Sequence, residues 1–254
     1  MFDQLVIEAS FLGILQGITE FLPVSSSGHL VIAQQFFPRL NEQPLLLNII
    51  LHLGTLLAIL VYFRSEIKKL FLEPKKLLPI ICATIVTVAI VFLFKNLIRS
   101  AFISSKFAGA MLIVTAIILF FASQKKDNQK QEVAPKSAIK IGIAQALAVL
   151  PGISRSGMTI STGIFLGIQT LVAFRFSFLL AIPVMFGAGI LELSELRFAS
   201  SQLMVSYFFG FVFSFLAGFW AIKFLMVKIS KDHKKLIYFS LYCFLLGFFV
   251  LFFL

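Results

Sequence analysis

LQGITEFLPVSSSGH, residues Leu15–His29, and LPGISRSGMTIS, residues Leu150–Ser161, are the two stretches that decide the fold of this chain. Each interrupts a long apolar region with a proline followed by serines and a glycine. Proline ends a helix and serine is a favoured N-cap, so each stretch predicts two half-length helices joined by a turn. At membrane depth such a pair forms a re-entrant hairpin, which is tolerated only where it is buried in protein or lines a polar cavity.

The two stretches also repeat one another along the chain. A shift of 129 residues places Gln16 on Gln145, Ser25 on Ser154, Ser27 on Ser156 and Gly28 on Gly157. The predicted organisation is therefore a first repeat over residues 1–122, a hydrophilic linker over 123–137 and a second repeat over 138–254. Each repeat holds one hairpin and three spans, and an odd number of spans inverts one half relative to the other.

The composition supports a membrane protein. Of the 254 residues, 59% are hydrophobic, only 13% are charged and 32 are Phe, and the mean hydropathy is +1.01. These values exclude a disordered chain, a disulfide scaffold and an ordinary soluble domain, and they favour an all-α integral membrane protein. Six transmembrane helices are expected at Leu45–Phe63, Leu77–Phe94, Phe107–Ala122, Leu171–Leu191, Leu203–Val227 and Leu236–Leu254.

The charged loops predict the orientation. The loops Arg64–Lys76, Lys125–Lys140 and Lys228–Lys235 carry 14 Lys and Arg, whereas the alternate loops carry only 5, namely Arg39, Lys95, Arg99, Lys106 and Arg197. Cytoplasmic loops are enriched in Lys and Arg, so both termini are expected outside. The net charge of +11 is explained by these loops, and no nucleic-acid partner is expected.

The first break carries the groups of a reactive site. Gln16 and Glu20 share one helical face, and a carboxylate inside an apolar run is a functional candidate, although Glu20 could instead cap or pair locally. Ser25, Ser26 and Ser27 begin the second helix, where free N–H groups attract anions. One of these serines could act as a nucleophile if His29 or Glu20 takes its proton, although one of them could also be a plain N-cap.

The second break adds Arg155 between Ser154 and Ser156. A buried arginine with no obvious fixed acidic neighbour is expected to bind an anion, and its planar fork suits phosphate. If the hairpins meet, Glu20 and His29 face Arg155 and Thr159, which is a constellation for phosphoryl transfer.

Other polar or reactive side chains in the spans receive structural interpretations. His52 is expected to be a packed, hydrogen-bonded residue, and Cys82 and Cys243 are expected to be buried packing residues rather than metal ligands.

These two breaks resemble the signature segments of the bacterial undecaprenyl-diphosphate phosphatases, also known as bacitracin-resistance proteins, and FSFLLAIP at Phe176–Pro183 resembles a third. The resemblance implies a metal-stimulated membrane hydrolase that removes the terminal phosphate of undecaprenyl diphosphate and so recycles the carrier lipid of cell-wall glycan synthesis. It implies Ser26 as nucleophile, His29 and Glu20 as acid–base partners, and Arg155 on the diphosphate. Direct attack by water with Glu20 as base is the alternative to a phosphoserine on Ser26. Substrate-binding positions are expected at Gln16, Ser25, Ser27, Gly28, Ser154, Ser156, Gly157 and Thr159.

One departure concerns the metal. Many members have Glu where this chain has Gln16, so a Mg²⁺ or Ca²⁺ ion is expected with Glu20 as its protein ligand, helped by substrate phosphates. The expected partners are a polyprenyl diphosphate lipid in a bacterial plasma membrane, with the pocket facing outside, and a homodimer is a further option. The alternative is a transporter or flippase of polyprenyl phosphate, since inverted repeats with broken helices are equally typical of carriers. A structural membrane component would leave Glu20, His29 and Arg155 without a reason to be buried.

Overall fold

A computed structural model describes residues 2–37, 40, 44–95, 104–126, 130–193 and 201–254. Within these ranges the chain is helical throughout, and its only β-type pairing is an isolated bridge between Lys130 and Ile168. The predicted all-α class is therefore confirmed. Arg39, Arg99 and Arg197, which entered the orientation argument, lie outside the described residues.

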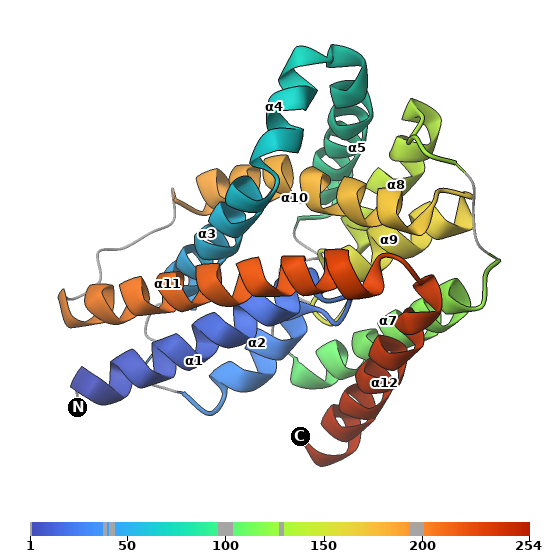
Figure 1. Cartoon of the computed structure of the whole chain (residues 1–254). Coiled ribbons are helices and arrows are strands. Elements are labelled where there is room, and N and C mark those ends of the chain that lie inside the picture. Colours follow the sequence, from blue (N-terminus) through green and yellow to red (C-terminus); the bar gives the residue numbers. More distant parts are fainter. Residues whose placement is uncertain (1, 38–39, 41–43, 96–103, 127–129, 194–200) are drawn as a thin grey trace.

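The helices follow the predicted order, with a hairpin at the start of each half (Figure 1). The first half contains α1 (Phe2–Phe21), α2 (Ser26–Gln34), α3 (Pro44–Tyr62), α4 (Arg64–Leu72), α5 (Pro74–Leu93) and α7 (Ser105–Ser123). The second half contains α8 (Pro135–Leu147), α9 (Arg155–Phe165), α10 (Thr170–Leu193), α11 (Ser201–Phe224), a π-helical turn η2 (Leu225–Ile229), a 3-10 turn η3 (His233–Lys235) and α12 (Leu236–Phe253).

The predicted spans correspond to long apolar helices. By length and composition, 5 helices within the described residues can cross a membrane: Pro74–Leu93, Ser105–Ser123, Thr170–Ile190, Leu203–Ile229 and His233–Phe253. A sixth is obtained if Leu46–Tyr62 and Arg64–Leu72, which meet at a bend of 71°, form one broken span. The chain is a multi-pass membrane protein.

The first hairpin differs from the prediction in the length of its first arm. The helix α1 has 20 residues and is therefore about 30 Å long, which is a full membrane thickness rather than half of one. Its partner α2 has 9 residues, and the arms of the second hairpin, α8 and α9, have 13 and 11. Only the second hairpin therefore consists of two short helices as predicted.

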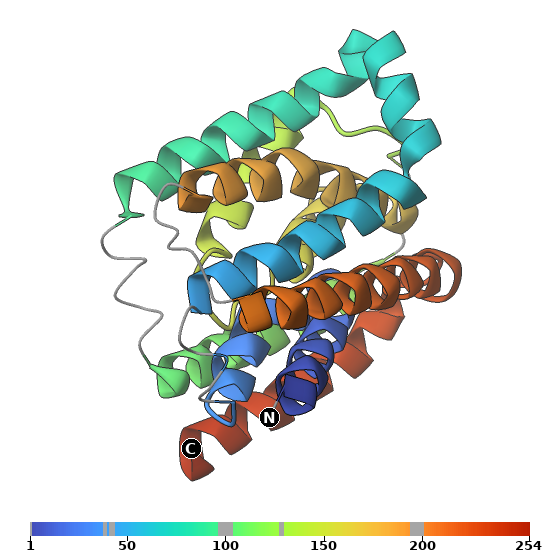
Figure 2. The ribbon, with the colours of Figure 1, turned by 90° about the vertical axis from the view of Figure 1, so that its left-hand side faces the viewer.

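Small residues bring each hairpin close to a helix of the other half. The helix α1 packs along α11 in both views (Figures 1 and 2), and a Cβ on Gly13 would collide with the carbonyl of Gly210. The helix α8 packs on α5, where a Cβ on Gly142 would lie 2.5 Å from the carbonyl oxygen of Ala83. Such close backbone approach is how membrane helices associate without a hydrophobic driving force. The first arm of each hairpin thus packs on a helix of the other half, whereas the inverted orientation of the halves and their exact boundaries stay predictions.

Candidate active site

The turn between α1 and α2 presents Ser26 as the first residue of a helix. Ser25 caps α2, and its Oγ accepts a hydrogen bond from the N–H of Gly28 at 3.3 Å. Its backbone has φ of 70°, a left-handed conformation that is rare for residues other than glycine. The carbonyl of Ser25 accepts from the Nδ1–H of His29 at 2.7 Å, which helps to hold this uncommon conformation. Ser26 is therefore presented from a constrained turn at the N-terminus of α2.

The turn between α8 and α9 is built in the same way. Ser154 caps α9, and its Oγ accepts from the N–H of Gly157 at 3.0 Å. Thr115 of α7 braces the turn, because its hydroxyl donates to the carbonyl of Gly152 at 2.9 Å and accepts from the N–H of Ser154 at 3.0 Å. Arg155 is thereby fixed as the first residue of α9.

The two turns touch, which meets the condition under which Glu20 faces Arg155. The hydroxyl of Ser156 donates to the carbonyl of Leu22 at 3.0 Å, which ties α9 to the end of α1. A Cβ on Gly28 would lie only 3.1 Å from the Cα of Gly152, so a larger residue at this crossing would have to push the second turn away. Because both contacts involve backbone, the N-termini of α2 and α9 are held face to face.

Glu20 lies at the centre of this arrangement and is only 8% exposed. One carboxylate oxygen, Oε1, accepts from Nη2 of Arg155 at 2.7 Å. The other, Oε2, accepts from the hydroxyl of Ser26 at 2.5 Å and from Nε2 of Gln16 at 3.0 Å. The structure therefore brings together four predicted site residues from three helices, and we call Gln16, Glu20, Ser26 and Arg155 the Glu20 cluster.

Arg155 corrects one expectation. The sequence suggests an arginine without a fixed acidic neighbour, yet Glu20 is that neighbour, 135 residues away along the chain. Nη1 of Arg155 also donates to the carbonyl of Ser177 at 3.4 Å. A guanidinium group has five N–H donors, so an ion pair with one carboxylate oxygen leaves it capacity for phosphate.

The remaining predicted residues lie at the edge of this cluster. His29 does not contact Ser26 through its ring: Nδ1 donates to Ser25, and in the neutral ring Nε2 accepts from the hydroxyl of Tyr242 at 2.7 Å. Thr159 turns its hydroxyl to that of Ser177 at 2.6 Å. The hydroxyls of Ser25 and Ser27 lie 3.4 Å apart. The proton acceptor that touches Ser26 is thus Glu20.

Three further residues contribute to the site. His52 is hydrogen-bonded as expected, through Nδ1 to the carbonyl of Asn48 at 2.8 Å, but its Nε2 also lies 3.6 Å from Oε2 of Glu20, and its side chain is 37% exposed. Ser177 holds Thr159 and Arg155, and Tyr242 holds His29. Ser177 falls within the FSFLLAIP segment and could have been found there, whereas no signal in the sequence identifies Tyr242.

The donor set for a divalent cation is small. No group of three or more His, Cys, Asp or Glu gathers in the part of the chain that the structure describes. However, Oε1 of Gln16 is buried and accepts no hydrogen bond from any described residue. An amide oxygen beside the carboxylate of Glu20 fits a hard cation that takes most of its ligands from substrate phosphates and water.

An apolar groove of about 380 Å³ opens beside the hairpin. Its polar members are His29 and Tyr242, and its apolar walls come from α1, α2 and α12. The apolar lining residues are Phe11, Leu15, Ile32, Ala33, Phe36, Phe37 and Leu246. The groove therefore runs along an apolar surface as far as His29, which lies three residues after Ser26 in α2.

The chain is similar to known proteins over nearly its whole length. The family model described as bacitracin resistance protein BacA matches residues 9–249, a range that contains every residue of the Glu20 cluster. A protein of Carboxydothermus hydrogenoformans named undecaprenyl-diphosphatase is 40% identical over 248 residues, covering 94% of each chain. Proteins with the same name from Syntrophotalea carbinolica and Methanococcus maripaludis are also 40% identical, covering 95% and 97% of this chain and 96% and 100% of their own.

Proposed function

Because the chain belongs to the family of bacitracin resistance protein BacA, we propose that it is an undecaprenyl-diphosphate phosphatase, a hydrolase that converts the lipid diphosphate to undecaprenyl phosphate and inorganic phosphate. The observation that carries the proposal is the hydrogen bond of 2.5 Å from the Ser26 hydroxyl to Glu20. A serine held against a carboxylate, with an arginine on the other carboxylate oxygen, supplies a nucleophile, a base and a phosphate-binding cation.

The first chemical step follows from these contacts. Oγ of Ser26 attacks the terminal phosphorus, and its proton passes to Oε2 of Glu20. The bond between this phosphorus and the bridging oxygen breaks, and the electron pair leaves with the bridging oxygen of undecaprenyl phosphate. Arg155 and the N-terminus of α2 stabilise the charge that develops on the transferred group.

The second step restores the serine. Water attacks the phosphorus of phosphoserine, and Glu20 returns its proton to Oγ of Ser26 as the P–O bond breaks. The hydroxyl group of the water completes inorganic phosphate, and its other proton is released to solvent. Glu20 thus serves as base in the first step and as acid in the second.

A divalent cation is part of the proposal. Oε1 of Gln16 and the carboxylate of Glu20 would hold Mg²⁺ or Ca²⁺ together with the substrate phosphates. When bound, the ion would neutralise negative charge on the diphosphate.

The substrate tail and the cellular setting complete the proposal. The apolar groove suits the polyprenyl chain, since it is lined by apolar side chains and reaches His29, three residues after Ser26. We place the protein in a bacterial plasma membrane with both termini and the pocket on the outer side, where it regenerates the carrier lipid for cell-wall glycan and confers bacitracin resistance. The loop charges support the outer position of the termini, whereas the outward-facing pocket rests on the family resemblance.

The test is phosphate release from a long-chain polyprenyl diphosphate by the purified protein in detergent, with and without Mg²⁺ or Ca²⁺. Ser26→Ala is expected to lower turnover about a thousandfold or more, because a missing nucleophile is poorly replaced. Ser10→Ala is the matched control, since Ser10 only bonds the carbonyl of Val6 within α1. Binding of the lipid without release by the parent protein under any metal would reject the phosphatase and favour a polyprenyl-phosphate transporter.

A further inference from the structure

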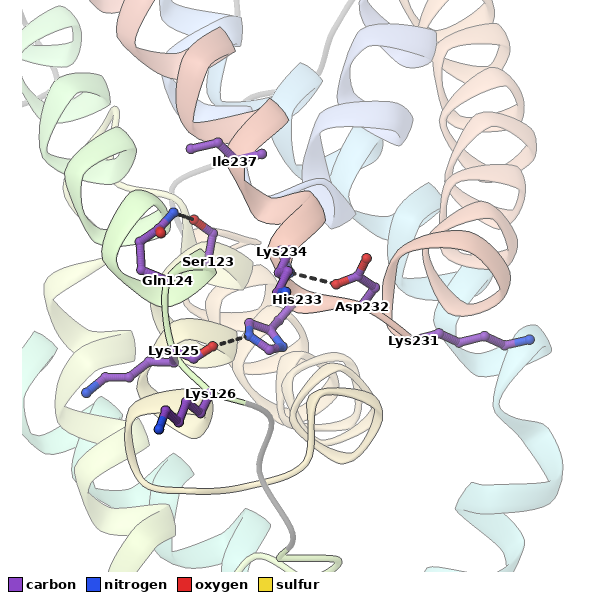
Figure 3. A pocket seen from close by; sticks show the side chains of 9 residues that line it. All are labelled: Ser123, Gln124, Lys125, Lys126, Lys231, Asp232, His233, Lys234 and Ile237. Atoms are coloured by element: carbon purple, nitrogen blue, oxygen red, sulfur yellow. Dashed lines mark hydrogen bonds between the residues drawn. The ribbon is translucent and has the colours of Figure 1, made fainter.

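A second cavity lies where the end of α7 meets the turn before α12 (Figure 3). It is a cleft of about 850 Å³, lined on one side by residues from Ser123 to Lys126 and on the other by residues from Lys231 to Lys234. None of the residues that line it belongs to the Glu20 cluster. The proposed phosphatase reaction therefore gives this cleft no role.

The lining of the cleft is strongly basic. Lys125, Lys126, Lys231 and Lys234 contribute four positive charges, and all four side chains are exposed. Among the residues that the structure describes, none of these lysines forms an ion pair with a carboxylate. The one acidic residue of the lining is Asp232, whose Oδ1 accepts from the backbone N–H of Lys234 at 3.1 Å.

The two walls of the cleft are joined by a buried histidine. Nε2 of His233 lies 2.6 Å from the carbonyl oxygen of Lys125, and Nδ1 lies 3.4 Å from the hydroxyl of Thr170 (Figure 3 shows the first contact). His233 is only 4% exposed. The backbone that carries the lysines is therefore fixed, although their long side chains can turn toward a ligand.

The position of the cleft identifies the ligand class. The candidate span over α7 ends at Ser123 and the span over α12 begins at His233, so the cleft lies where two spans leave the membrane. Ile237, in the first turn of α12, adds an apolar wall. We propose that this cleft binds the phosphate group of an anionic membrane lipid, with the lysines around the phosphate and the acyl chains along α12. Basic pockets between transmembrane helices bind anionic head groups in this way.

The proposal is tested by native mass spectrometry of the full chain in detergent with added phosphatidylglycerol or phosphatidylcholine. The parent is expected to bind phosphatidylglycerol at least about tenfold more tightly than phosphatidylcholine, because about fivefold per lysine is typical near anionic lipid. The triple variant Lys126→Gln, Lys231→Gln and Lys234→Gln should lose this preference. Its matched control is Lys68→Gln, Lys69→Gln and Lys75→Gln, which removes the same charge from exposed positions in α4 and at the start of α5.

Retained preference in the control and loss in the cleft variant would support the site, provided that circular dichroism shows the same helix content in both. Equal loss in both variants would show a general effect of net charge and overturn the proposal. Unchanged binding by the cleft variant would also overturn it. Competition by inorganic phosphate or pyrophosphate at the concentration of the lipid would identify a soluble anion as the ligand instead. None of these outcomes depends on phosphatase activity.

Discussion

Replacing Arg155 by methionine removes the cation that neutralises Glu20 inside the membrane domain. The ion pair has a nitrogen–oxygen distance of 2.7 Å, and the two side chains are 15% and 6% exposed. After the substitution, Glu20 keeps hydrogen bonds from Ser26 and Gln16 and lies 3.6 Å from Nε2 of His52, but it loses the only Arg or Lys that contacts it among the described residues. The matching substitution Glu20→Gln leaves the guanidinium group of Arg155 without its carboxylate.

The size of the effect follows from this burial. Two unit charges about 4 Å apart attract by about 4 kcal/mol at an effective dielectric constant of about 20. Removing one partner of a buried pair typically costs about 3–5 kcal/mol, because the other charge stays desolvated. The double variant Glu20→Gln with Arg155→Met should cost less than the sum of the two single variants, with a coupling energy of about 3 kcal/mol.

The assay is a double-mutant cycle on the free energy of unfolding, measured by titration with a denaturing detergent in mixed micelles. The control is the exposed pair of Lys76 and Glu73, which has the same nitrogen–oxygen distance of 2.7 Å but side chains that are 56% and 52% exposed. Removing this pair should not measurably lower the free energy of unfolding. The argument from burial would be refuted if each single variant of the buried pair lowered the free energy of unfolding by less than about 1 kcal/mol and the two effects added within about 0.5 kcal/mol.

Three further predictions concern other contacts. Gln16→Glu places a second carboxylate beside that of Glu20, so phosphate release should depend more steeply on the concentration of Mg²⁺ or Ca²⁺ in a metal titration. An unchanged titration curve would contradict this prediction. Tyr242→Phe removes the hydroxyl that contacts His29 at 2.7 Å, a hydrogen bond worth about 1 kcal/mol, or a factor of about five in rate. Because Tyr242 does not touch the nucleophile, kcat should fall less than about tenfold. A fall in kcat above a hundredfold would show that Tyr242 takes part in the chemical step. Gly142→Val should lower the free energy of unfolding by about 2–3 kcal/mol, because its Cβ would lie 2.5 Å from a backbone oxygen of α5. The control Gly187→Val, where nothing lies within 4 Å of an added Cβ, should leave stability nearly unchanged in the same unfolding assay.

The spans and breaks could be predicted because their signals are local. A run of apolar residues long enough for the bilayer, or a proline followed by a serine cap, is complete within about twenty residues. Both serine caps, Ser25 and Ser154, act as the sequence predicts. The ion pair between Glu20 and Arg155 could be anticipated only in part, because the internal repeat indicates two equivalent turns and Glu20 faces Arg155 only if these turns meet.

The other contacts of the site and the full length of α1 depend on tertiary packing that one sequence does not reveal. His52 resembles any polar residue in an apolar helix, and only the packing of α3 beside α1 brings it to Glu20. Tyr242 reaches His29 across 213 residues of sequence, from a Phe-rich helix that reads as lipid-facing surface. The full length of α1 was missed because its polar residues lower its hydropathy, while packing against α11 supports the helix.

The separation of Glu20 from Arg155 has a consequence for biosynthesis. The two residues that neutralise each other are 135 positions apart, and ribosomes add about 5–20 residues per second, so the carboxylate waits on the order of ten seconds for its cation. During that interval the first hairpin has no counter-charge from the second half, and an unpaired carboxylate is costly in lipid. We therefore expect the hairpin to reach its final position only after the second half has been inserted, and either half made alone to lack this ion pair.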